Sequence, residues 1–170
     1  MKIVKIHYLK SEKVKSYKQI ETTAKEMQAF LNNGIGGRTG YALAHCQIED
    51  QKPLAFFVCN SDQVGFDKMW EDFAIINPEI VEAKSVVNVS KDPKKEDMRS
   101  NVATYKEGCF SFPYRKDKNV KRFYQIKVKY YIRGKYLGLK KIEKVIEGLQ
   151  AHIFQHEVDH INSKNIYFEK

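Results

Sequence analysis

The sequence lacks any apolar stretch long enough to cross a membrane. No run of about 18 apolar residues occurs in the 170-residue chain, which argues against a transmembrane helix. The first residues, MKIVKIHYLKSEK, contain no long apolar core of the kind found in secretory signals. We therefore expect a protein with no membrane partner.

Cysteine is also scarce. The chain has three cysteines, Cys46, Cys59 and Cys109, and an odd, low number does not build the disulfide framework of a small secreted domain. A reducing compartment is the simpler interpretation, and there a cysteine can serve as a metal ligand or a nucleophile. We expect a cytoplasmic location, with an organellar or viral origin left open.

The residues that are abundant indicate a globular chain. The apolar fraction is 42% and the charged fraction 30%, which suits a single domain over residues 1–170 with its own core. The formal net charge of +9 attracts polyanions. Contact with ribosomal RNA is one interpretation, and lysines that only keep the protein in solution are the other. The scattered lysines favour the second, and no motif for sequence-specific nucleic-acid binding is visible.

Apolar spacing predicts two helices. Over 17–33, Ala24, Met27 and Leu31 recur at helical intervals, and Gly34 can end the helix. A final helix is expected over 140–161, with Gly148 inside it. Its apolar stripe consists of Ile142, Val145, Ile146, Leu149 and Ile153.

Short apolar or alternating runs between these helices predict strands. The runs are 42–49, 54–60, 73–77, 80–90, 102–106 and 122–132. Prolines should lie between strands, where they break no ladder. They are Pro53, Pro78, Pro93 and Pro113.

The strongest chemical signal is an H-E-x-x-H pattern over residues 156–160. Residues four apart on a helix lie about 6 Å apart on one face, so His156 and His160 can bind one ion. Glu157, one residue further round, can reach water at that ion as a general base. Histidines on a core face can also be packing residues. Both continue the apolar stripe, and this register favours a metal site.

Two histidines leave a catalytic metal site incomplete, because such sites usually have three protein ligands. Downstream of His160, only Glu169 is an acidic candidate for the third ligand. We therefore expect this ligand to lie upstream of His156. His152 precedes His156 by one turn, but three turns of a straight helix do not easily converge on one ion. Cys109 follows Gly108, which permits close approach. The full set of upstream candidates is His7, His45, Cys46, Cys59, Cys109 and His152.

Three segments resemble the motifs of peptide deformylases. Residues 107–111, Glu-Gly-Cys-Phe-Ser, match the family motif E-G-C-x-S, and residues 155–160, Gln-His-Glu-Val-Asp-His, match Q-H-E-x-D-H. Residues 40–47 match G-x-G-L-A-A-x-Q in part, because Ala42 replaces a glycine and His45 an alanine. The Asn77-Pro78 pair also agrees with the family, and the order of the segments is the same.

The resemblance implies an α+β fold, in which antiparallel or mixed sheets pack around a C-terminal helix that carries H-E-x-x-H, with an N-terminal helix. It implies Cys109, His156 and His160 as ligands of one divalent ion, most often Fe(II), with Zn(II), Ni(II) or Co(II) as alternatives. It also implies Glu157 as the acid and base, and the Gln47 amide and the Phe110 backbone N–H as donors to the substrate carbonyl.

The implied activity is hydrolysis of the formyl group from the N-terminal formylmethionine of nascent peptides. The basic charge of the chain could bring it to the ribosome surface near the exit tunnel. An extended peptide should lie beside strand 40–44, and the implied substrate-binding residues are Gly40, Ala42, Gly108 and Phe110. His152 and Ile153 are further candidates for lining the methionine pocket.

Several neighbouring residues have expected supporting roles. Asp159 should pair with Arg115 or Arg122, and Glu107 should position the Gly40 loop. His45 can enter the site or pack against the core, and we favour packing.

Two alternatives remain at this stage. One is a metallohydrolase for another N-acyl or peptide bond, which the changes at Ala42 and His45 keep open. The other is a non-catalytic ribosome- or RNA-associated protein with the same fold.

Overall fold

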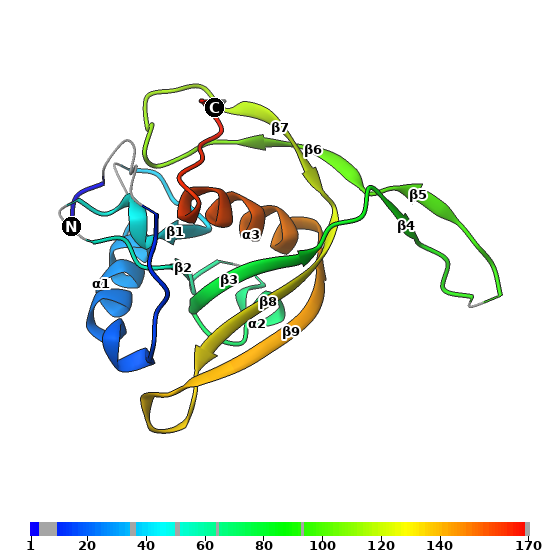
Figure 1. Ribbon diagram of the computed structural model, residues 1–170. Helices are drawn as coiled ribbons and strands as arrows, with labels where there is room; N and C mark the ends of the chain where they lie inside the picture. Colours follow the sequence, from blue (N-terminus) through cyan, green and yellow to red (C-terminus); the bar gives the residue numbers. More distant parts are fainter. Residues whose placement is uncertain (4–9, 35–36, 50–51, 64, 93, 169–170) are drawn as a thin grey trace.

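The computed structural model describes residues 1–3, 10–34, 37–49, 52–63, 65–92 and 94–168. Two candidate ligands, His7 and Glu169, lie outside these residues. A central helix, α3 (Gly148–Ile161), lies between the largest sheet and a ribbon of two strands (Figure 1). A second helix, α1 (Glu21–Asn32), lies at the other side of the sheet near its β1 and β2 end. The predicted α+β arrangement is confirmed.

The largest sheet has five strands, and each neighbouring pair is antiparallel. In spatial order the strands are β1 (Ala42–Ala44), β2 (Phe56–Cys59), β3 (Ala74–Glu82), β8 (Gln125–Arg133) and β9 (Leu139–Glu147). Strand β1 is therefore an edge strand.

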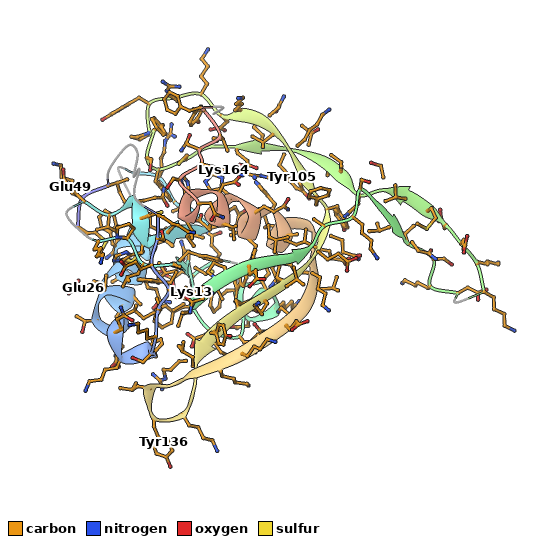
Figure 2. All side chains as sticks on the ribbon, viewed as in Figure 1. Lys13, Glu26, Glu49, Tyr105, Tyr136 and Lys164 are labelled. Atoms are coloured by element: carbon orange, nitrogen blue, oxygen red, sulfur yellow. The ribbon has the colours of Figure 1, made fainter. Side chains whose placement is uncertain are left out.

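Two antiparallel ribbons extend from this body. One pairs β4 (Val86–Asn88) with β5 (Met98–Ser100) and projects away from the rest of the chain (Figure 1). The other pairs β6 (Val102–Glu107) with β7 (Lys118–Phe123) and lies over α3. The short elements are α2 (Phe66–Met69) and 3-10 turns at Tyr17–Gln19, His45–Gln47 and Lys135–Leu137. Tyr136, in the last of these turns, points away from the body (Figure 2).

The core has two parts because β2 is covered on both faces. Successive side chains of a strand point to opposite faces. Phe57 and Cys59 pack in the part that contains α3, whereas Phe56 and Val58 pack in the part that contains α1. A strand buried on both faces is apolar throughout, as 56–59 is, and this double burial holds α3 in a fixed position against the sheet.

The predicted helix over 140–161 was wrong over residues 140–147. Residues 139–147 form β9, which pairs with β8 along its whole length. Ile142 and Ile146 are four apart, a spacing that fits one face of a strand as well as one face of a helix. Val145 separates the two alternatives, because its side chain is 57% exposed rather than part of a buried stripe.

Three smaller predictions also need correction. The expected helix over 17–33 is a 3-10 turn followed by α1. The expected strand over 42–49 ends at Ala44, and a 3-10 turn follows. Pro78 lies inside β3, which continues past it through a register shift between Ile76 and Glu79. A bulge of this kind tolerates proline because it removes a ladder hydrogen bond at that point.

Candidate metal centre

Helix α3 begins abruptly, and this start sets its register. Gly148 has a φ of +59°, a left-handed conformation that glycine adopts without steric cost. Its N–H donates to the Tyr124 carbonyl oxygen at 2.8 Å. The chain thus turns from β9 into the helix at one residue, and the next turns present His152, His156 and His160 along one side.

Cys109 supplies the third donor atom beside two of these histidines. Its Sγ lies 3.3 Å from Nε2 of His160, and the Nε2 atoms of His156 and His160 are 3.2 Å apart. The donor atoms of all three residues lie within 4.8 Å of one another. Residues 51 positions apart in the chain therefore converge on one point.

The donor set fits a divalent ion. Around a tetrahedral ion with bonds of about 2.0–2.3 Å, neighbouring donors lie about 3.3–3.6 Å apart, close to the two distances given above. Burial alone would raise the pKa of the Cys109 thiol, but the nearby His160 and His156 rings outweigh it and lower this pKa to about 5. The sulfur is then a thiolate, the form that binds metals.

Glu107 organises the residues behind the donors. Its Oε2 lies 2.8 Å from Nδ1 of His156, its Oε1 lies 2.9 Å from Nε2 of His152, and the Arg122 guanidinium donates to both oxygens at 2.7 and 3.0 Å. Burial would raise the pKa of Glu107, but hydrogen bonds from His152, His156 and Arg122 hold it well below its usual range. Among the described residues, the hydrogen bonds of Glu107 go to His152, His156 and Arg122 rather than to the Gly40 loop, which it was expected to position. This carboxylate instead fixes the ring of His156 so that Nε2 faces the other donors.

Asp159 pairs with Arg122, one of the two arginines expected for it. Arg115 instead lies over three aromatic rings, those of Phe112, Tyr167 and Phe168. Arg122 thereby ties β7 to Glu107 and to α3 at once.

Glu157 is buried beside the donors. Its Oε2 atom has no hydrogen-bond partner among the described residues. Burial raises the pKa of this carboxyl group, although His156 and His160 oppose the shift. A carboxyl group with a raised pKa accepts a proton more readily than an ordinary glutamate, as a general base requires.

A cavity of about 290 Å³ opens over this cluster. Phe110 and Gly40 line this cavity. The Phe110 ring packs directly on Gly40, since a Cβ at Gly40 would lie only 2.1 Å from the ring. His152 is stacked on Tyr105, which Figure 2 labels near α3, with ring centroids 4.3 Å apart. The lining includes the predicted residues Gly40, Ala42, Gln47, Gly108, Cys109, Phe110, His152, Ile153, His156 and Glu157.

The Gln47 amide is held at the cavity by contacts at both ends. The Ala44 N–H donates to its Oε1 at 2.9 Å, and its Nε2 donates to Ser111 Oγ at 3.1 Å. The same Nε2 lies 3.8 Å from Cys109 Sγ. Ser111 therefore orients this amide.

Other upstream candidates lie elsewhere or have other contacts. The buried His45 ring lies tilted against the Phe56 ring and accepts a hydrogen bond from the Leu54 N–H at Nδ1, so it packs as expected. Cys46 and Cys59 belong to the apolar core. Sequence reasoning missed Asn165, whose amide lies 3.7 Å from Cys109 Sγ. No local pattern marks that residue, because only the fold brings it to the sulfur.

The fold and these donors together define the class of H-E-x-x-H metalloproteins in which a cysteine supplies the third donor. The family model described as polypeptide deformylase matches residues 2–169. The chain therefore belongs to the peptide deformylase family.

Individual relatives agree with this assignment. A curated peptide deformylase of Thermotoga maritima is 42% identical over 90 residues, which are 52% of this chain and 42% of that protein. The aligned region thus spans less than half the length of these Thermotoga relatives. The solved peptide deformylase of Thermotoga maritima has a TM-score of 0.68 at 26% identity, over 98% of this chain and 94% of its own. That of Legionella pneumophila has a TM-score of 0.66 at 30% identity, over 96% and 83%.

Proposed function

We propose that this protein is an active peptide deformylase, which hydrolyses the formyl group of N-terminal formylmethionine and releases formate. The observation that carries this proposal is the convergence of Cys109, His156 and His160 beside a buried Glu157, whose Oε2 meets no hydrogen-bond partner in the described part of the chain. Membership of the family and the cavity over these residues support it. We also propose that residues 1–170 act as one catalytic domain.

In this proposal Cys109, His156 and His160 hold one divalent ion. Fe(II) is the first choice, and one thiolate with two imidazoles also suits Zn(II), Ni(II) or Co(II). When bound, the ion supplies a Lewis acid that makes water nucleophilic near neutral pH.

The residues of the chain move the protons. Glu157 accepts a proton from the attacking water and delivers it to the leaving amine nitrogen as the carbon–nitrogen bond breaks, so that water and the formyl amide become formate and a free N-terminus. The Gln47 amide and the Phe110 N–H donate to the formyl oxygen as negative charge develops on it.

The edge strand β1 offers a place for the substrate backbone. It pairs with β2 on one side only within the five-stranded sheet. An extended peptide can add to such an edge through main-chain hydrogen bonds, which accept many sequences. Gly40, Ala42, Gly108 and Phe110 line the cavity at this point and form the proposed substrate site.

Formylated nascent chains are the proposed partners, and the cytoplasm is the proposed location. The net charge of +9 supports an attraction to the ribosome surface near the exit tunnel. None of the described helices is long and apolar enough to cross a membrane.

Release of formate from formyl-Met-Ala-Ser by anaerobically iron-loaded protein tests the proposal. We expect turnover that depends on the metal and on Glu157. Bound metal without release would favour a hydrolase for another N-acyl or peptide bond. A protein that binds no metal would favour a non-catalytic ribosome- or RNA-associated role.

A further inference from the structure

A second hollow adjoins the cavity over the metal centre and is lined mainly by cations. Arg38, Lys106 and Asp117 line both of them. The second hollow adds Tyr114, Arg115 and Lys116. We call its four cations, Arg38, Lys106, Arg115 and Lys116, the basic rim. One carboxylate against four cations leaves this surface strongly positive.

The charges of the basic rim are available to a ligand. All four residues are exposed, and none of the ion pairs among the described residues involves them. The Arg115 guanidinium already lies over the Phe112, Tyr167 and Phe168 rings, so the uncommitted charges are those of Arg38, Lys106 and Lys116. The one acidic residue, Asp117, lies over Gly108, because its Oδ1 would be 2.9 Å from a Cβ there. Elsewhere on the surface, lysines such as Lys127 and Lys141 pair with Glu143.

The loop that carries half of the rim is held in place. The Phe112 N–H donates to the Cys109 carbonyl oxygen at 2.9 Å, and the Arg115 N–H donates to the Phe112 carbonyl oxygen at 3.0 Å. Tyr167 donates its hydroxyl to the Lys116 carbonyl oxygen at 3.1 Å. These turns continue directly from the Cys109 donor, so the rim has a fixed position relative to the metal centre.

We propose that the basic rim binds an acidic side chain of the substrate peptide, downstream of the formylmethionine, and so favours acidic nascent N-termini. This inference rests on the proposed deformylase function. A peptide that extends from the first cavity toward the second brings its later residues to the rim. The ligand chemistry is a carboxylate, which arginine and lysine bind through charge-assisted hydrogen bonds.

The test uses pairs of peptides that differ only in one Asp or Asn. Each is a formyl-Met-Ala-Ala-Ala amide with Asp or Asn at the second, third or fourth position, and the amide removes the terminal carboxylate as a competing source. At one position, kcat/KM for the Asp peptide should exceed that for the Asn peptide roughly three- to tenfold at low salt, since several exposed cations each contribute modestly. The preference should vanish at about 1 M salt, where the Debye length is about 3 Å.

Charge reversal locates the effect. In Lys116→Glu and in Arg38→Glu, the ratio of Asp to Asn peptides should fall to one or below. In the control Lys121→Glu, which reverses an exposed charge on β7 outside both hollows, the ratio should not change. Because each ratio compares two peptides on one variant, differences in metal loading cancel.

Binding to the zinc-loaded Glu157→Ala protein, measured by calorimetry with the same pairs, separates the two proposals. Tighter binding of the Asp peptide to this variant supports the rim even if the unsubstituted, metal-loaded protein releases no formate. That second result would contradict only the deformylase activity. Equal affinities and equal kcat/KM values at all three positions would overturn the rim and leave the deformylase proposal standing.

Discussion

Oε2 of Glu107 lies 2.8 Å from Nδ1 of His156, and the same carboxylate accepts two hydrogen bonds from the buried Arg122 guanidinium. The side chain of Glu107 is 1% exposed. A carboxylate in this position keeps the hydrogen on Nδ1 and leaves the lone pair on Nε2 for the ion. The motif E-G-C thus places two residues with different roles at the end of β6. Glu107 supports His156, and Cys109, two residues later, is itself a ligand.

Glu107→Gln should weaken metal binding about 10–100-fold, because an amide can present its NH₂ group to His156 and loses the charge that faces Arg122. Competition with a chelator measures this affinity. The control Glu143→Gln removes an exposed ion-pair partner and should leave the affinity unchanged. Equal affinities in both variants would contradict the supporting role of Glu107.

Glu157→Ala should retain the ion and lose about 10²–10⁴-fold in kcat, the usual contribution of general acid–base catalysis. Its unfolding free energy should not fall, because the variant removes a buried carboxyl group whose Oε2 has no hydrogen-bond partner among the described residues. Formate release, metal content and thermal unfolding measure the three effects. The control is Glu147→Ala, at the exposed last residue of β9. Undiminished turnover in Glu157→Ala would remove this residue from the mechanism.

The three cysteines should react very differently in metal-stripped protein. The pKa of Cys109 is about 5, whereas burial raises the pKa of Cys46 to about 12 and that of Cys59 well above its ordinary value. Alkylation by iodoacetamide, mapped by mass spectrometry, should therefore modify Cys109 first. Its rate should be nearly constant from about pH 6 to 8 and fall as the pH drops through about 5, because only the thiolate reacts. Zinc should protect it, and faster labelling of Cys46 or Cys59 would contradict the assigned ionisation.

Asn101 ties the projecting β4–β5 ribbon to the main sheet. This fully buried side chain donates to the carbonyl oxygens of Lys84 and Gln125 at 2.6 and 2.7 Å and accepts from the Gln125 N–H at 2.7 Å. Asn101→Ala leaves these groups unsatisfied and should lower the unfolding free energy by about 3 kcal/mol. Denaturant unfolding measures the loss, with the exposed Asn119→Ala as the control. A loss in Asn101→Ala no larger than in the control would refute the anchoring role.

The helix turn from His156 to His160 could be read from the sequence because the pattern is local. The third donor could not, since Cys109 meets that turn only through the pairing of β6 with β7 and their packing on α3. Resemblance of motifs, rather than spacing, singled out Cys109 among six upstream candidates.

The wrong prediction of a helix over residues 140–147 has a similar cause. Residues four apart share a face in both helices and strands, so Ile142 and Ile146 could not distinguish them. Pairing with β8, a long-range contact, decided the outcome. The glycine at position 148 was the one local feature that could have indicated the boundary between strand and helix. Its φ is positive, and the helix begins there.

The central claim is that the Cys109 sulfur and the two imidazoles bind the same ion. Titration of metal-stripped protein with Co(II), followed by the thiolate-to-cobalt charge-transfer absorption, tests it most directly. The account predicts a band that saturates at one ion per chain and disappears in Cys109→Ser, while Cys46→Ser and Cys59→Ser retain it. An undiminished band in Cys109→Ser, or no band in the unsubstituted protein, would contradict the account.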